Sequence, residues 1–238
     1  MTKTTEKSET IVDIEEVYDK TEHFIEEHKK QIGIITGIIV FLVVAYISWH
    51  KFYITPREKE AQSFMFTAEL SFAKDSFKLA LDGAGIRKDA LEHIPGNFLG
   101  FLDIADEYSH TKSANLAKYY AGICYLHLGE YENAIKKLED FTSDDYMVSS
   151  IARGAIGDAY MELGNNDKAL KYYLKAAENS KNNFTTPVYL MKAGLAYEDA
   201  GKYKDAVEVY EKIRDEYAET MEGRDVPKYI ARAKAQIN

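Results

Sequence analysis

The stretch Gly157-Asp-Ala-Tyr160-Met-Glu-Leu-Gly164-Asn-Asn-Asp-Lys-Ala169 decides the fold, because its spacing occurs three times in the chain. Its counterparts are Gly122-Ile-Cys-Tyr125-Leu-His-Leu-Gly129-Glu-Tyr131-Glu-Asn-Ala134 and Gly194-Leu-Ala-Tyr197-Glu-Asp-Ala-Gly201-Lys-Tyr203-Lys-Asp-Ala206. In each block a tyrosine follows the first glycine by three residues, a second glycine by seven and an alanine by twelve. A fixed period of this length indicates a repeated supersecondary unit.

The residue types in the block have a physical reading. Glycine and alanine are small, so two antiparallel helices can approach closely there, and the tyrosine is expected to fill the space beside them. The second glycine supplies the left-handed residue that a turn between helices needs. The pattern resembles the tetratricopeptide repeat (TPR), a helix–turn–helix of about 34 residues. We therefore predict an all-α, TPR-like solenoid of helical pairs, with clear repeats at 115–141, 150–178 and 187–217.

Degenerate copies are predicted on both sides of these repeats, so that the TPR-like domain covers residues 54–238. Degenerate repeats occupy 57–111, where Thr55-Pro56 is expected to supply a helix N-cap and a first-turn proline. The run Asp82-Gly-Ala-Gly85 is expected to end a helix early and open a loop over 82–97. Residues 98–108 are predicted as one more helix, and residues 225–238 as the capping helix that a solenoid requires.

An apolar segment precedes the repeats. From Ile32 to Ile47 only Thr36 is polar. The 22 residues from Ile32 to Tyr53 would form a helix of about 33 Å, which matches a hydrocarbon core of about 30 Å. Lysines at one end and aromatic residues at the other are typical of headgroup regions. We predict a transmembrane helix at 31–53, and not a cleaved signal peptide, because the leader is long and acidic. Gly33 and Gly37 form a G-x-x-x-G pattern that favours close packing of a partner helix, although glycine is also common in membrane helices.

Residues 1–30 are predicted to be a polar tail, with either a short amphipathic helix or a weakly helical segment at 11–28. This tail has five lysines, whereas residues 51–60 have three basic residues. The positive-inside rule therefore weakly favours a cytoplasmic N-terminus.

Several functional classes are disfavoured by composition. The chain has 39 acidic and 30 basic residues, whereas nucleic-acid binding needs clustered Lys and Arg. Cys124 is the only cysteine, so it forms no internal disulfide, and we expect it to be a small buried apolar residue. No nucleophile, metal-ligand or phosphate-loop motif occurs, so we predict no enzymatic activity, no metal and no cofactor.

The inner face of the first helix of each pair is the candidate protein-binding site, because TPR superhelices bind ligands there. By repeat register this groove contains Leu116, Tyr119, Ile123, Leu126, Ile151, Asp158, Met161, Val188, Met191, Leu195 and Glu198. An apolar face with methionines suits extended hydrophobic segments or a partner helix. The alternative is that the protein's own helices fill the groove.

The order of tail, span and repeats resembles the YfgM-like family of bacterial inner-membrane proteins, in the form found in Bacteroidetes. The resemblance is carried by Val17-Tyr-Asp-Lys-Thr-Glu-His-Phe-Ile-Glu-Glu-His-Lys-Lys30, by the glycine-containing span and by Asn115-Leu-Ala-Lys-Tyr-Tyr-Ala-Gly122. It implies a cytoplasmic N-terminus and a periplasmic repeat domain. It also implies contacts with Sec translocon subunits, with a membrane-anchored periplasmic prolyl isomerase or chaperone, and with exported polypeptides.

These observations together predict a membrane-anchored TPR adaptor that assists the Sec translocon, with the lipid bilayer and proteins as its partners. An alternative is a TPR scaffold for a different cell-envelope complex. A third reading is a eukaryotic organelle import receptor. That reading is disfavoured because the Lys and Asn clamp that some TPR domains use for chaperone C-termini is replaced here by Tyr119, Ile123, Asp158 and Val188.

Overall fold

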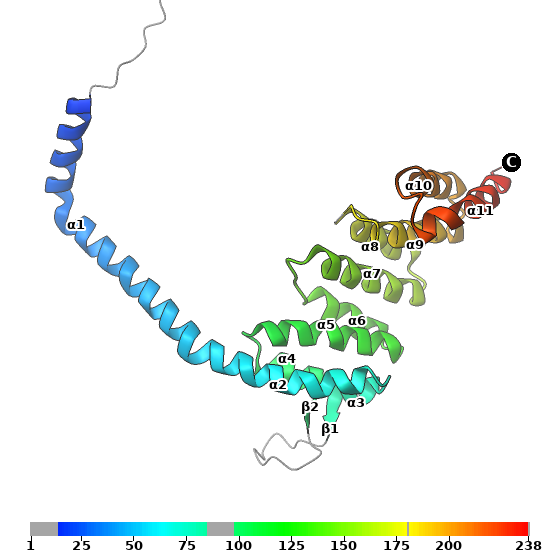
Figure 1. Ribbon diagram of the computed structural model, residues 1–238, viewed down its shortest axis with the longest axis horizontal. Coiled ribbons are helices and arrows are strands. Elements are labelled where there is room, and N and C mark those ends of the chain that lie inside the picture. The colour runs from blue at the N-terminus through cyan, green and yellow to red at the C-terminus, as the bar shows by residue number, and fades with distance from the viewer. Residues whose placement is uncertain (1–13, 85–97, 180, 238) are drawn as a thin grey trace, which may run out of the picture. The chain divides into compact units, whose positions relative to one another are not determined.

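The structure, a computed structural model, describes residues 14–84, 98–179 and 181–237 (Figure 1). For residues 14–26 only the backbone is described, so the predicted polar face of the tail lies outside the described side chains, as does most of the predicted 82–97 loop. The chain divides into two units, Met1–Thr55 and Pro56–Asn238.

The first unit consists of helix α1 (Ile14–Trp49) and the π-helical turn η1 (His50–Ile54). Among the described residues, the helical stretch that begins at Glu27 is the one that has the length and apolar composition needed to cross a bilayer. Its apolar side chains, such as Phe41 and Leu42, are exposed within this chain. Gly33 and Gly37 face open space, so the packing of a partner helix there stays a prediction.

The predicted N-cap at Thr55 is wrong, because Thr55 is itself the first residue of α2 (Thr55–Phe72) and follows the helical turn η1 directly. Thr55 has helical backbone angles, φ −62° and ψ −43°, and its N–H donates to the carbonyl of His50. The Thr55 hydroxyl donates to the same carbonyl at 3.0 Å. Pro56 has no N–H to continue the α-helical ladder, and a single wider turn before a proline accommodates that missing donor.

The second unit is a stack of antiparallel helical pairs (Figure 1). Its N-terminal part contains α2, α3 (Phe77–Asp82), strands β1 (Gly83–Ala84) and β2 (Phe98–Leu99), and α4 (Phe101–Glu107). Three regular pairs follow: α5 (Lys112–His127) with α6 (Tyr131–Glu139), α7 (Tyr146–Glu162) with α8 (Asn166–Glu178), and α9 (Thr186–Asp199) with α10 (Tyr203–Glu216). Helix α11 (Met221–Ala235) follows and packs against α10 and α9.

Element boundaries near residue 98 and at the start of α11 also differ from the prediction. Residues 98–99 are not the start of a helix but a short strand, antiparallel to β1, in which Gly83 pairs with Leu99. Glycine is needed beside this pair, since a Cβ on Gly100 would lie 2.3 Å from the Gly83 nitrogen. Helix α11 begins at Met221 and not at residue 225, because the Thr220 hydroxyl caps it by accepting from the Gly223 N–H at 3.1 Å.

The glycines of the repeat block lie where the pattern predicts, but the side chain that packs on the first glycine differs from the prediction. The second glycine of each block, Gly129, Gly164 and Gly201, has a φ of +76°, +70° and +70°, which confirms the left-handed turn. The first glycine faces the paired helix. However, the side chain that fills the space is not the tyrosine three residues later. It comes from the second helix, at Tyr173 for Gly157 and at Tyr210 for Gly194.

The start of α2 is joined to the turn between α4 and α5. The Arg57 guanidinium donates to the carbonyl of Glu107 at the end of α4 and lies 4.9 Å from the centre of the Tyr108 ring. The Glu58 carboxylate accepts from the Lys112 N–H at 2.6 Å and from the Ser113 hydroxyl at 2.7 Å, at the start of α5. A cation therefore meets a helix C-terminus and an anion meets a helix N-terminus, as helix dipoles favour.

Candidate protein-binding groove

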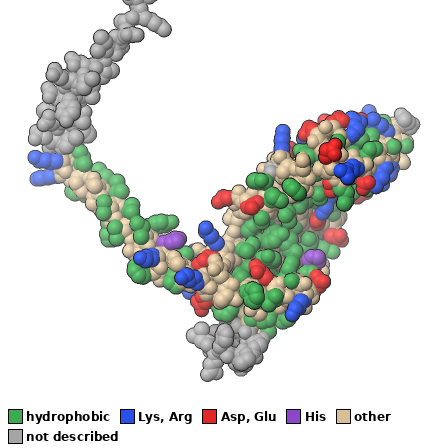
Figure 2. All heavy atoms as spheres, in the orientation of Figure 1, with side chains coloured by type: hydrophobic (Ala, Val, Ile, Leu, Met, Phe, Trp, Pro, Cys, Tyr) green, Lys and Arg blue, Asp and Glu red, His purple; other side chains and the backbone are tan. Residues whose placement is uncertain are grey.

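A cavity of about 490 Å³ opens beside the first helices of the three regular pairs. We call it the groove. It is lined by Leu126, Tyr131, Asp158, Met161, Glu162, Tyr173, Lys192, Leu195, Ala196 and Asp199. Of the predicted site residues, Leu126, Asp158, Met161 and Leu195 lie in this lining. Figure 2 shows hydrophobic side chains gathered over α5 and α7. Helices α5, α7 and α9 thus each contribute apolar side chains to one hollow.

Three of the predicted residues of α5, Leu116, Tyr119 and Ile123, lie outside the cavity lining, as does Ile151 of α7. Tyr119 and Ile123 pack against the apolar cluster that α6 and α7 share, and the Tyr119 ring lies 5.4 Å from the ring of Phe141. Burial raises the pKa of the Tyr119 hydroxyl. Leu116 and Ile151 are exposed. Part of the predicted apolar face is therefore used in the protein's own packing.

At the α9 end, two of the predicted residues, Met191 and Glu198, are used in the protein's own packing. Met191 packs against the cluster formed by α8 to α11. Val188 is half-buried. The Glu198 carboxylate accepts from Arg232 of α11 through two bonds of 2.9 Å. The alternative that the protein's own helices fill the predicted site therefore holds for Glu198.

Two hydrogen-bonded triads cross from one pair of helices to the next. In the first, the Tyr173 hydroxyl donates to Asp158 at 2.7 Å, and Lys192 contacts the same carboxylate at 2.6 Å. In the second, the Tyr210 hydroxyl donates to Glu198 at 2.7 Å, and Arg232 contacts that carboxylate. Burial and the adjacent carboxylate raise the pKa of both phenols, so each tyrosine stays a neutral donor.

The triads explain why Asp158 is a poor candidate for binding a cation of a partner. Its carboxylate lies in the groove lining, but Tyr173 and Lys192 already satisfy its oxygens. Lys192 and Tyr131 also line the groove, although the repeat register did not predict them. A signal was available, because the cation follows the carboxylate by 34 residues in both triads.

A close contact between α7 and α9 was also missed. Tyr189 packs on Gly154, where a Cβ would lie 1.9 Å from the tyrosine ring. Burial is the main cause that raises the pKa of Tyr189. Gly154 precedes Gly157 by three residues, and neither other block has glycine at this position, so the repeat pattern gave no signal for it.

Metal-ligand clusters and the single cysteine were two candidate features for chemistry. Within the described ranges, no three His, Cys, Asp or Glu side chains are placed to hold a metal ion. Burial raises the pKa of the Cys124 thiol to about 12, so it is protonated near neutral pH.

Comparisons with known proteins agree with the helical repeats. Residues 116–145 and 154–219 match the tetratricopeptide repeat. Tetratricopeptide repeat protein 29 from Macaca fascicularis is 29% identical over 127 residues, and the same protein from Homo sapiens is 32% identical over 130 residues. Each alignment covers 50% of this chain and 27% of the relative, so the chain spans about a quarter of the length of these relatives.

Two solved structures are also similar to the chain. The crystal structure of MamA protein has a TM-score of 0.47 at 16% identity and covers 74% of this chain and 88% of that one. A Podosopora anserina putative kinesin light chain structure with nearly identical TPR-like repeats has a TM-score of 0.46 at 13% identity, with coverage of 79% and 87%.

Proposed function

We propose that this tetratricopeptide-repeat protein is a non-enzymatic adaptor, anchored in a membrane, whose groove binds segments of other polypeptides. TPR arrays are scaffolds for protein–protein interaction. The observation that carries the proposal is the groove, where Leu126, Met161 and Leu195 come from the first helices of three successive pairs and lie beside the paired Asp158 and Lys192. A hollow with apolar walls and few fixed polar groups is typical of sites that bind apolar segments.

Membrane attachment would serve this function by raising the local concentration of the groove near its ligands. The apolar helix of the first unit supports the anchor by its length and composition. We place the protein in the bacterial inner membrane, with its N-terminus in the cytoplasm and its repeats in the periplasm. This placement rests on the lysine bias of residues 1–30 and on the resemblance described above.

The same resemblance leads to the finer proposal. The protein would be an ancillary subunit of the Sec translocon, next to a membrane-anchored periplasmic prolyl isomerase or chaperone, and its groove would receive exported polypeptides as they emerge. Unfolded exported chains expose the apolar segments that the groove walls suit.

A second candidate function is a scaffold for a different cell-envelope complex, with one folded partner in the groove. The two triads favour it, because they tie successive helical pairs together and leave a groove of fixed shape. A preorganised surface suits a single partner of complementary shape.

Photocrosslinking separates the two candidates. A photoreactive residue is placed at Met161 in the groove, with a matched control at Lys171, which is exposed on α8 and outside the groove lining. In cells that produce the full chain, the adaptor proposal expects many exported polypeptides to be captured at Met161 and few at Lys171. One dominant folded partner would support the scaffold, and equal labelling at both positions would contradict both candidates.

The anchor and its orientation are tested in the same cells. The full chain should stay with membranes during alkaline carbonate extraction. Protease added to the outer face should cleave the repeat domain and spare the N-terminal tail. Extraction with the soluble fraction would contradict the anchor, and protection of the repeat domain would contradict the exported-chain proposal.

A further inference from the structure

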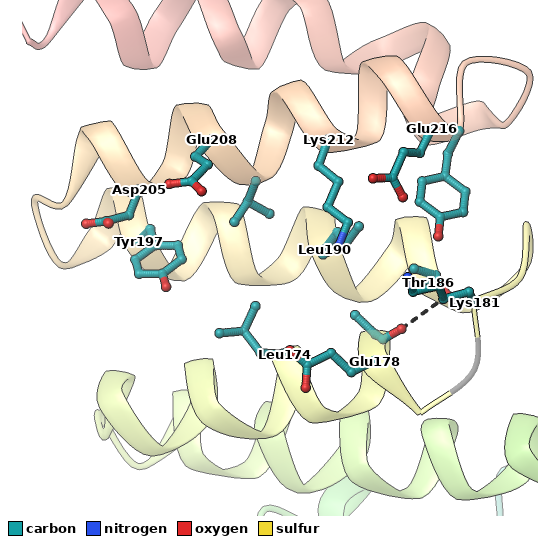
Figure 3. Close-up of a pocket in the computed structure, with 13 residues that line it drawn as sticks. Leu174, Glu178, Lys181, Thr186, Leu190, Tyr197, Asp205, Glu208, Lys212 and Glu216 are labelled. Atoms are coloured by element: carbon teal, nitrogen blue, oxygen red, sulfur yellow. Dashed lines mark hydrogen bonds between the residues drawn. The ribbon is translucent and has the colours of Figure 1, made fainter. Parts of the chain in front are cut away.

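A second cavity lies on another part of the array, between α8, α9 and α10 (Figure 3). Its volume is about 490 Å³, and none of its lining residues belongs to the groove described above. Leu174, Leu190 and Val209 give it apolar walls. Figure 3 shows Tyr197 at one end, with Asp205 and Glu208 of α10 beside its ring, and Leu174 and Glu178 of α8 across the opening.

The charged groups of this cavity are mostly acidic. Its lining has the carboxylates of Glu178, Asp205, Glu208 and Glu216 against the ammonium groups of Lys181 and Lys212. Within the described part of the chain, none of these four carboxylates takes part in an ion pair. The cavity therefore has a net negative charge next to its apolar walls.

The aromatic end of the cavity is the most acidic part. Burial, and after it the charges of Asp205 and Glu208, raises the pKa of Tyr197, which places both carboxylates within electrostatic reach of the ring. The charge of Lys202 lowers the pKa of Tyr197, but the Lys202 ammonium forms an ion pair with the Asp167 carboxylate at 3.4 Å. In Figure 3, Lys212 lies beside Leu190, away from Tyr197.

The preceding repeat shows what occupies the equivalent place. The counterpart of Tyr197 is Tyr160, 37 residues earlier. There the ammonium of Lys168 lies 4.9 Å from the centre of the Tyr160 ring, and the Tyr172 ring stacks on it at 5.6 Å. A cation over a tyrosine face is a favourable contact.

This internal cation is missing from the later repeat. The residue 37 positions after Lys168 is Asp205, and the residue 37 positions after Tyr172 is Val209. Compared with Tyr160, the ring of Tyr197 thus lacks both the cation and the stacked ring, and it has a carboxylate at the position of the cation. The change leaves a place that a basic side chain from another molecule fits by shape and by charge.

We propose that this cavity binds a lysine or arginine side chain of a partner polypeptide. The cation lies on the Tyr197 ring between Asp205 and Glu208, and an apolar neighbour in the partner packs on Leu174 and Leu190. The site uses residues other than those of the groove, so it holds or fails independently of the function proposed above.

The probe for this proposal is a fluorescein-labelled decapeptide that alternates leucine and arginine. Its binding to the full chain in detergent micelles is followed by fluorescence anisotropy, and a decapeptide that alternates leucine and glutamate is the comparison. We expect the arginine peptide to bind at least about tenfold more tightly than the glutamate peptide, because its charges complement the cavity.

Asp205→Lys is the decisive variant, since it restores the residue type that the preceding repeat has over its tyrosine. We expect it to weaken binding of the arginine peptide about tenfold, and Glu208→Gln to weaken it about threefold. Asp140→Lys is the matched control. It changes the net charge equally on the exposed end of α6, outside both cavities, and should leave the affinity unchanged.

Three results would overturn the proposal. The first is equal affinity for the two peptides. The second is equal weakening by Asp205→Lys and Asp140→Lys, which would reflect overall charge alone. The third is loss of arginine-peptide binding in Met161→Glu, with Asp205→Lys unaffected, which would place the peptide in the groove. Circular dichroism of each variant verifies that the helices are retained.

Discussion

Replacement of Gly194 by alanine should destabilise the repeat unit strongly, although alanine is the better helix former. The new methyl carbon would lie 2.1 Å from Cε1 and 2.6 Å from Cζ of Tyr210. The ring has little freedom to move away. Tyr210 is fully buried, and its hydroxyl is held at 2.7 Å from Glu198, which Arg232 holds in turn.

The magnitude follows from three contributions. Overpacking of a core site costs about 1–3 kcal/mol. Displacement of the ring would also break the bond from Tyr210 to a charged carboxylate, worth about 1.5–3 kcal/mol. Alanine regains about 1 kcal/mol of helix propensity over glycine. We therefore expect Gly194→Ala to lower the free energy of unfolding by about 1.5–5 kcal/mol.

The assay is urea unfolding of the full chain in detergent, followed by far-ultraviolet circular dichroism and by hydrogen exchange of α9 and α10. Gly201→Ala is the control, because nothing lies within 4 Å of its Cβ position and only its φ of +70° is strained, at a cost of about 1 kcal/mol. In a Tyr210→Val background the cost of Gly194→Ala should nearly disappear. If Gly194→Ala is as stable as the parent, or costs the same in both backgrounds, the steric reasoning is refuted.

Three further predictions concern other parts of the repeat unit. Glu58→Ala should lower the free energy of unfolding by about 1–2 kcal/mol, because it removes the acceptor for the Lys112 N–H and the Ser113 hydroxyl. An unchanged midpoint in urea titrations would contradict this capping role. Burial raises the pKa of Tyr108 from 10.0 to about 12, so the folded state holds the phenolic proton more tightly. Stability should therefore be intact below pH 10, the unfolded value, and decline as the pH rises toward 12, and an identical decline in a Tyr108→Phe variant would be inconsistent with this. Cys124 should react with a thiol reagent only after unfolding, because its thiol is buried and has a pKa of about 12, and rapid labelling of the folded chain would disprove that burial.

The repeats could be predicted from the sequence because their signal is local and is repeated three times. The positions of Gly129, Gly164 and Gly201 followed from the left-handed backbone of a helix-to-helix turn, which few other residues adopt. The partner of each first glycine was less accessible. Tyr160 and Tyr173 belong to the same repeat, and only the packing of the second helix shows that Tyr173 contacts Gly157.

The groove could be predicted only in part. Helical register placed Leu126, Met161 and Leu195 on one face, and these three do line a common cavity. Register alone does not show which side chains bond to each other across repeats. The pairing of Asp158 with Lys192 depends on how far one helical pair is rotated against the next, and that angle results from packing rather than from any single residue.

The second triad has a consequence for the role of α11. Asp158 receives its cation from the first helix of the following pair, whereas Glu198 receives Arg232 from α11. The residue 37 positions before Arg232 is Leu195, so a further copy of α9 in place of α11 would bring no cation to Glu198. Helix α11 is therefore specific to this position, because it neutralises the carboxylate that accepts from the buried Tyr210.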